Sequence, residues 1–252
     1  MRFFDCNCHF GLPADPRNKR PVDVTTLLDA MDRSGVEKAL AWHVAQRDAG
    51  AITGNDLLAR AIAPHDRLYG CWALLPDQTG ELGGIGEFID AALASRVRAF
   101  TAWPEESHFL LRGEVLGDVF EEMILRRIPL LYRCTWDESG ESWTRIYDLL
   151  KSFPQLTVIL CNVGCWGPDR LFRPLLDTYP NVYLEISQYI LDGGIESFVE
   201  RYGAGRLLYG SDFPSAYHGG MMLAIAHADI STGDKEAVAG GNIERLLDRV
   251  LT

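Results

Sequence analysis

The chain begins with the stretch Phe4-Asp5-Cys6-Asn7-Cys8-His9-Phe10-Gly11, in which apolar or small residues alternate with polar ones. Such alternation predicts a β-strand, because successive side chains of a strand point to opposite faces. Asp5, Asn7 and His9 should share one face, and the two cysteines should point away from His9. The strand starts the first of eight short apolar runs, at 3–6, 39–43, 68–74, 97–101, 129–133, 157–161, 182–186 and 207–209.

The segments between these runs carry leucine, isoleucine and phenylalanine at helical spacing. A chain that alternates strand with helix eight times is expected to form an α/β fold, a closed parallel (β/α)₈ barrel. No linker or change in composition divides residues 1–252, so we expect a single domain. Residues 225–252 should form two helices that cover the barrel, with Gly240-Gly241-Asn242 as a break and N-cap between them. The clearest helical segments are 24–32, 85–94, 115–127, 143–152 and 170–179.

Composition and charge exclude several classes of protein. With 47% hydrophobic and 23% charged residues, the 252-residue chain has the composition of a soluble globular protein. A net charge of -11 and the lack of a basic run make nucleic acid an unsuitable partner. No apolar run approaches the ~20 residues of a membrane span, and no secretion signal begins the chain. We therefore expect a cytoplasmic protein with reduced cysteines, and leave the formation of a homo-oligomer open.

The active site of such a barrel lies at the C-terminal ends of the strands and in the loops that follow. Four of the six tryptophans fall at or just beyond these ends, which is typical of an aromatic-lined pocket for a small molecule. The alternative is that the indole rings plug the barrel or form a contact between subunits. Those four tryptophans are Trp42, Trp103, Trp136 and Trp166.

Three motifs carry a resemblance to a known family: Arg206-Leu-Leu-Tyr-Gly-Ser-Asp212-Phe-Pro214, Pro180-Asn181-Val182-Tyr183 and Arg67-Leu-Tyr-Gly70. On these motifs the chain resembles the amidohydrolase superfamily of TIM-barrel metal-dependent hydrolases. It is most similar to the amidohydrolase-2 branch, which includes lactonases and metal-dependent decarboxylases. The resemblance implies a hydrolase or decarboxylase in which Asp212 serves as metal ligand and general base.

The chain departs from the family pattern at three metal-ligand positions. The His-x-His pair of the first strand becomes Asn7 and His9, the fifth-strand histidine becomes Arg133, and the sixth-strand histidine becomes Asn162. Only His9 and Asp212 remain as good ligands, whereas zinc sites usually take three or four. A guanidinium at contact distance would also repel a divalent cation. We therefore expect a degenerate site with no metal, or with a weakly bound divalent metal such as zinc.

The polar residues at the strand ends suggest individual roles. Asp212 is expected to act as a base for water, or else simply to cap the following helix. His9 and Arg133 are the other candidate catalytic residues, although a histidine at that position is often a core residue. The guanidinium could hold Asp212, bind a substrate carboxylate or oxyanion, or pair with Glu185 or Asp137. The candidate substrate-binding residues are Asn7, Asn162, His108, Trp103, Trp136, Trp166 and Tyr189.

Two functional hypotheses follow from these residues. The first is an enzyme, a hydrolase or decarboxylase that acts on a small carboxylate-bearing or lactone-type molecule, with or without a metal. The second is a catalytically silent protein that binds a small molecule on the same barrel. The fold alone does not distinguish them.

Overall fold

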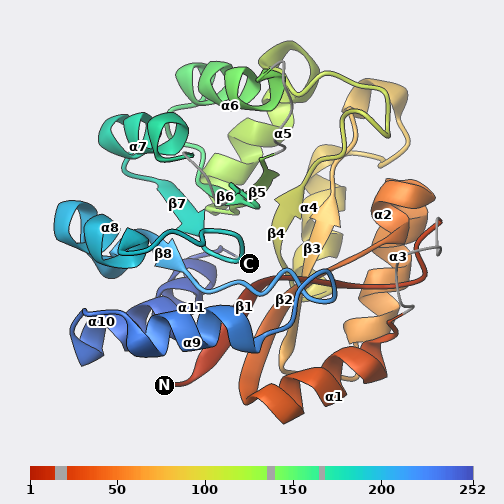
Figure 1. Cartoon of the computed structure of the whole chain (residues 1–252). Helices are drawn as coiled ribbons and strands as arrows, with labels where there is room; N and C mark the ends of the chain where they lie inside the picture. Colours follow the sequence, from red (N-terminus) through yellow and green to blue (C-terminus); the bar gives the residue numbers. More distant parts are fainter. Residues whose placement is uncertain (15–21, 135–139, 165–167, 252) are drawn as a thin grey trace.

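The computed structural model describes residues 1–14, 22–134, 140–164 and 168–251. In this part of the chain eight parallel strands form one sheet in sequence order (Figure 1). Their order and direction confirm the predicted barrel. The strands are β1 (Phe3–Phe10), β2 (Val36–His43), β3 (Leu68–Ala73), β4 (Val97–Thr101), β5 (Leu130–Arg133), β6 (Val158–Cys161), β7 (Val182–Glu185) and β8 (Leu207–Leu208).

The barrel closes where the segment after β8 meets β1. The amide of Cys6 donates to the carbonyl of Tyr209 at 3.0 Å, and the amide of Asp212 donates to the carbonyl of Asn7 at 2.9 Å. The amide of His9 donates to the carbonyl of Phe213 at 2.8 Å. These bonds fix the segment that carries Asp212 directly to the strand that carries Asn7 and His9.

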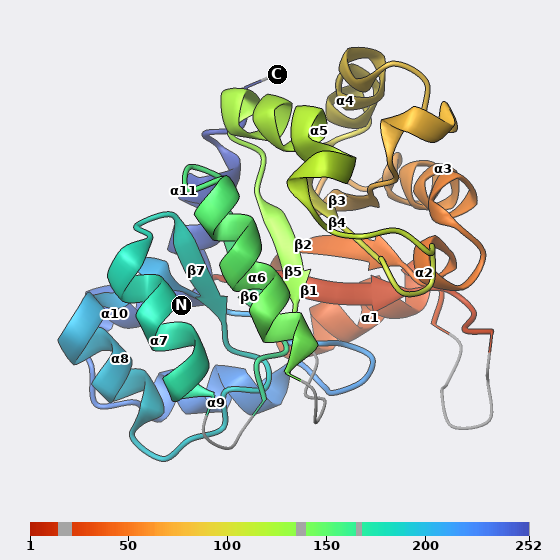
Figure 2. The same ribbon diagram turned by 90° about the horizontal axis from the view of Figure 1, so that it is seen from above.

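Helices surround the strands on the outside (Figures 1 and 2). The first of them shows how the sequence sets helix ends: Asp23 caps α1 by accepting the amide of Thr26 at 2.7 Å, and Gly35 ends it with a φ of 75°. The α-helices are α1 (Val24–Ser34), α2 (Ala45–Asp48), α3 (Ala51–Ile62), α4 (Ile85–Ala94), α5 (Gly113–Arg126), α6 (Glu141–Ser152), α7 (Asp169–Thr178), α8 (Gly194–Tyr202), α9 (Gly219–His227), α10 (Thr232–Glu236) and α11 (Asn242–Leu247). Short helical turns lie at Asp77–Thr79 (η2), Ala204–Arg206 (η3) and Ala237–Gly241 (η4).

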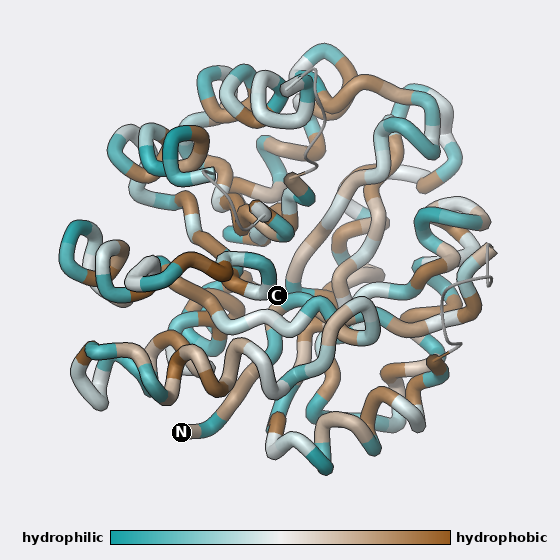
Figure 3. Tube along the Cα trace, in the orientation of Figure 1, coloured by the Kyte–Doolittle hydropathy of each residue, from teal (hydrophilic) through white to brown (hydrophobic). Residues whose placement is uncertain are grey.

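The apolar core has two parts. One cluster fills the inside of the barrel and includes Phe4, Leu40 and Leu131. The other lies between the strands and the helices and includes Phe3, Phe100 and Leu130. Apolar residues accordingly run along the strands, while hydrophilic positions are frequent on the surrounding helices (Figure 3). Burial of both faces of every strand is expected for a parallel sheet.

The expectation that Asp5, Asn7 and His9 share one face is wrong for Asp5. A shift in the pairing of β1 with β2 lies between Asp5 and Cys8. Cys6 accordingly packs inside the barrel, whereas Cys8 packs toward the helices. A bulge of this kind inserts a residue into a strand and so resets the alternation of its side chains. Asn7 and His9 are both turned toward the barrel interior as a result.

The C-terminal segment differs in detail from the expectation. Residues 237–241 form a turn of π-helix that runs directly into α11, so Gly240-Gly241 is not a break. Asn242 does not cap a helix, since its side-chain amide donates to the carbonyls of Ala204 and Leu207 at 2.8 Å. A Cβ at Gly240 would lie 2.8 Å from the carbonyl oxygen of Arg2, so only glycine lets this turn cover the N-terminal end of the barrel.

In the described ranges, no helix combines the length and apolar character that crossing a bilayer requires.

Candidate active site at the C-terminal ends of the strands

A polar network lies at the C-terminal ends of β1, β5 and β6. The Arg133 guanidinium donates to the side-chain oxygen of Asn162 at 3.1 Å and, over a longer 3.4 Å, to that of Asn7. The side-chain amide of Asn7 in turn donates to a carboxylate oxygen of Glu185 at 3.0 Å. Asn7 is fully buried. The side-chain oxygens of both asparagines thus face the Arg133 guanidinium, and the side-chain nitrogen of Asn7 faces the carboxyl group of Glu185.

Asp212 lies beside this network. Its backbone has a φ of 56°, a conformation that favours glycine or asparagine, and its amide is held by the carbonyl of Asn7. Its side chain accepts a long hydrogen bond of 3.4 Å from Gln188. Burial raises the pKa of Asp212 above its ordinary value, although the positive charge of Arg133 and a hydrogen bond from Asn162 oppose that rise. The carboxyl group therefore binds a proton more readily than an exposed aspartate does.

Arg133 does not pair with a carboxylate, contrary to two of the expected arrangements. Among the described residues its guanidinium forms no ion pair with Asp212 or Glu185, and its polar contacts there are the two asparagine oxygens. Asp137, the third expected partner, lies outside the described residues. The cation is thus held by neutral groups at the mouth of the barrel.

Glu185 is a buried carboxyl group, for which Arg133 was one of the expected partners. Instead it accepts hydrogen bonds from the amide and hydroxyl of Ser187, from Asn7 and, at 3.3 Å, from the amide of Asn162. A Cβ at Gly210 would clash with Glu185 Oε1, so glycine at this position leaves room for the carboxyl group. Complete burial raises the pKa of Glu185 to about 7.

This raised pKa predicts a pH-dependent stability. Between pH 4.5 and about 7 the folded protein keeps a proton on Glu185 that the unfolded chain has released. The free energy of unfolding should therefore fall as pH rises through that range, by roughly 3 kcal/mol, and change no further from this group above it. Glu185→Gln removes the titration, so urea denaturation at pH 5 and pH 8 should show a smaller difference in the variant. An equal difference in both proteins would contradict the assignment.

An aromatic pair underlies Arg133. Its guanidinium carbon lies 4.4 Å from the ring centre of Trp42 and 5.0 Å from that of Trp103. The imidazole of His9 stacks on Trp42, with ring centres 4.5 Å apart. Such contacts favour the cation and fix its plane. Trp42 is only 2% exposed and Trp103 only 8%, so Trp103 is a buried support for Arg133 rather than part of an open aromatic rim.

The remaining predicted site residues lie elsewhere. His108 is exposed in the turn after β4, away from its expected place in the network. Tyr189 is buried, and its hydroxyl donates to Asp169 at 2.8 Å rather than facing Arg133. Trp136 and Trp166 lie outside the described residues.

A second buried polar group braces Asp212 from the outer side of β1. Asp5 accepts the amide and hydroxyl of Ser211 and the amide of Asn7, and His218 Nε2 lies 3.4 Å from its carboxylate. The hydroxyl of Ser211 also accepts the amide of Phe213 at 2.9 Å. The residues on both sides of Asp212 are thereby fixed. The bulge in β1, which sequence alternation did not reveal, gives Asp5 this role.

The residues at the mouth do not fit a divalent metal ion. Within the described residues no group of three or more His, Cys, Asp or Glu side chains is placed to hold one. The amide oxygens of Asn7 and Asn162, which could supplement His9 and Asp212, already accept N–H groups of Arg133. A divalent ion among them would lie beside a guanidinium that stays protonated.

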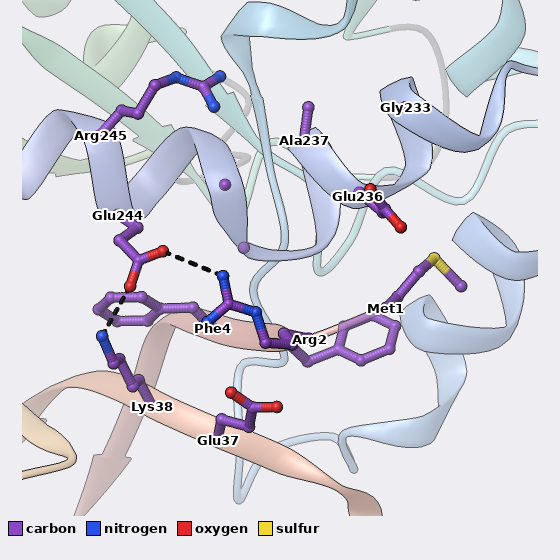
Figure 4. Close-up of a pocket in the computed structure, with 13 residues that line it drawn as sticks. Met1, Arg2, Phe4, Glu37, Lys38, Gly233, Glu236, Ala237, Glu244 and Arg245 are labelled. Atoms are coloured by element: carbon purple, nitrogen blue, oxygen red, sulfur yellow. Dashed lines mark hydrogen bonds and ion pairs between the residues drawn. The ribbon is translucent and has the colours of Figure 1, made fainter.

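The opposite end of the barrel holds a separate cavity of about 430 Å³ (Figure 4). Glu244 there pairs with Lys38 at 2.6 Å and with Arg2 at 3.8 Å. Glu244, Lys38 and Arg2 are thus paired with one another, and the N-terminal face of such barrels contributes to stability rather than catalysis. We therefore place the candidate site at the mouth.

Comparison with known proteins identifies the family. The amidohydrolase family model, Amidohydro_2, matches residues 4–249. The chain therefore belongs to the amidohydrolase-2 family. None of the curated proteins compared with the chain matches it.

Several solved structures share the fold over the whole chain. The 2,6-dihydroxybenzoate decarboxylase from Rhizobium has a TM-score of 0.74 at 15% identity, over 98% of this chain and 99% of that one. The 5-carboxyvanillate decarboxylase from Sphingomonas paucimobilis has a TM-score of 0.73 at 18% identity, over 98% and 99%. A dihydroxybenzoic acid decarboxylase from Polaromonas sp. JS666, with bound manganese and 2-nitroresorcinol, has a TM-score of 0.73 at 17% identity, over 98% and 97%. At these identities the likeness shows the fold.

Proposed function

We propose that this protein is an enzyme that decarboxylates a small aromatic carboxylate, with the guanidinium of Arg133 in place of a metal ion. The proposal rests on one observation, the charge and the contacts of the Arg133 guanidinium. Its charge lies at the barrel mouth on the ring of Trp42, held by two amide oxygens and by no carboxylate among the described residues. A planar guanidinium with unused N–H groups is well suited to bind a carboxylate through two parallel hydrogen bonds.

Asp212 supplies the proton in this scheme. Loss of carbon dioxide from an aromatic acid requires a proton at the carbon that bears the carboxylate. The Asp212 carboxyl, whose pKa is raised by burial, transfers its proton to that carbon. The bond to the carboxylate then breaks, its electron pair returns to the ring, and carbon dioxide leaves. Solvent reprotonates Asp212 for the next cycle.

The family and its structural neighbours support this class of reaction. Three of the neighbours are decarboxylases of hydroxylated benzoates. We infer a carboxylate substrate from the positive charge of Arg133. The Polaromonas enzyme binds manganese, whereas the residues present here are better suited to place the guanidinium in that role. A lactone or amide hydrolase would instead use Asp212 as a base for water.

The proposal is tested with protein stripped of metal by a chelator. Turnover of 2,6-dihydroxybenzoate, 5-carboxyvanillate and simple lactones is followed by carbon dioxide release and by chromatography. We expect release of carbon dioxide from an aromatic acid by the wild type, and its loss in Asp212→Asn. Tight binding of the acids without turnover would instead support the silent binding protein. Failure to bind any of them would overturn the assignment of Arg133.

A further inference from the structure

A groove of about 680 Å³ lies outside the site just described, between α8 and α9. Figure 1 shows these two helices side by side next to the loops that follow β7 and β8. We call it the α8–α9 groove. None of Arg133, Asn7, Asn162 or Asp212 lines it. Its lining includes Ser187, Ile190, Ser211, Tyr217, Gly220 and Ala224.

The walls of this groove are apolar and partly open to solvent. Met221 and Ala228 are buried in its floor, whereas Ile190 is 70% exposed and Tyr217 is 75% exposed at its edge. A Cβ at Gly220 would meet no atom within 4 Å, so the space beside α9 is empty of protein. A cavity of this size with an apolar lining is typical of a small-molecule site.

Two serine hydroxyls at one end of the groove can accept hydrogen bonds from a ligand but cannot donate them. The hydroxyl of Ser187 donates to Glu185 at 3.0 Å, and the hydroxyl of Ser211 donates to Asp5. Each hydroxyl carries a single hydrogen, and the Ser211 oxygen also accepts the amide of Phe213, so the lone pairs of Ser187 and one lone pair of Ser211 remain for a ligand. A ligand group that binds these serines must therefore be a hydrogen-bond donor.

The charges around the groove exclude an anion. Asp192 and Glu196 contribute acidic side chains to the lining, and the buried carboxyl group of Asp5 lies behind Ser211. His227 is the one lining residue among those described that can carry a positive charge. A carboxylate or phosphate would be repelled here, in contrast to the site at Arg133.

We propose that the α8–α9 groove is a second binding site, which takes an apolar-bodied molecule with a neutral hydrogen-bond-donating head, that is, a phenol. The aromatic body packs against Met221 and Ala224, and its hydroxyl donates to Ser187 or Ser211. This site is independent of the reaction proposed for the barrel mouth. Its ligand differs from the substrate of that site by lacking the negative charge.

The test uses two probes with the same ring system, 2-naphthol and 2-naphthoate, in calorimetric titrations of the whole chain. Ala224→Phe fills the groove and should weaken 2-naphthol binding by about tenfold or more. Ala226→Phe is the matched control, since Ala226 is an exposed residue of the same helix that does not line the groove. It should leave the affinity within about twofold of the wild type. Tyr217→Ser, which changes an exposed side chain and leaves the apolar core intact, should also weaken 2-naphthol binding.

Three results would overturn the proposal. The first is 2-naphthol binding that is absent from the wild type or unchanged in both Ala224→Phe and Tyr217→Ser. The second is equal binding of 2-naphthoate in the groove, shown by the same losses in these two variants. The third is a dimer in analytical ultracentrifugation that Leu223→Asp or Tyr217→Ser converts to a monomer, because the groove would then be covered by a second copy of the chain. Loss of carboxylate binding in an Arg133 variant tests the site at the barrel mouth and should leave 2-naphthol binding in the α8–α9 groove unchanged.

Discussion

Replacement of Arg133 with methionine is expected to weaken the binding of 2,6-dihydroxybenzoate by about 100-fold. Hydrogen bonds to charged groups contribute about 1.5–3 kcal/mol each, and a guanidinium can make two with one carboxylate. Methionine fills a similar space above Trp42 but offers no donor and no charge. Calorimetry on the wild type and the variant measures the change, and denaturation in urea shows whether the variant is folded.

Arg145→Met provides the matched control for this experiment. Arg145 and Arg133 both line a small cavity of about 100 Å³ beside β5, but the guanidinium of Arg145 already pairs with Glu105 and Glu141. Its loss should change the affinity for the carboxylate by less than about threefold, since exposed ion pairs contribute little. Equal affinity in Arg133→Met and the wild type would show that Arg133 does not bind the substrate.

The second large effect is the creation of a metal site. The triple variant Asn7→His, Arg133→His, Asn162→His joins three imidazoles to His9 and Asp212 and removes the guanidinium. Because three or four such ligands suffice for zinc, it should retain about one equivalent of zinc or manganese after dialysis. Wild-type protein should retain less than one. Added metal should also raise the melting temperature of the variant but not of the wild type, since a ligand that binds only the folded state stabilises it.

The double variant Asn7→His, Asn162→His isolates the effect of the charge. It adds two imidazoles but keeps Arg133, whose guanidinium repels a divalent ion. It should therefore bind far less metal than the triple variant. If the wild-type protein held one equivalent of zinc through extensive dialysis, the claim that Arg133 takes the place of a metal ion would be wrong.

The sequence predicted the barrel well because its signals are local. Each strand is a short apolar run and the helices have a clear apolar spacing, so the limits of β4 and α4 agree with the expected 97–101 and 85–94. The short β8 was expected at 207–209 and observed at 207–208. The closure of the barrel then follows from the count of strands and the right-handed connection between them.

The site was less predictable because it depends on side-chain direction and on contacts across the barrel. A single bulge in β1 turned Asp5 away from Asn7 and His9, and alternation cannot reveal it. Glu185 accepts hydrogen bonds from Ser187, Asn7 and a backbone amide instead of Arg133. Gly210 leaves room for its carboxyl group, and such a contact across the barrel has no local signal in the sequence. Trp103 is covered by its neighbours Trp42 and Arg133, although its place at a strand end suggested an open rim.

The most direct test of the central claim, that Arg133 binds the carboxylate in place of a metal ion, is a pair of calorimetric titrations. 2,6-Dihydroxybenzoate is titrated into wild-type protein treated with chelator, first without added metal and then with manganese. Since the guanidinium is part of the chain, we predict the same affinity in both titrations. Binding that appears only when manganese is added would contradict the account.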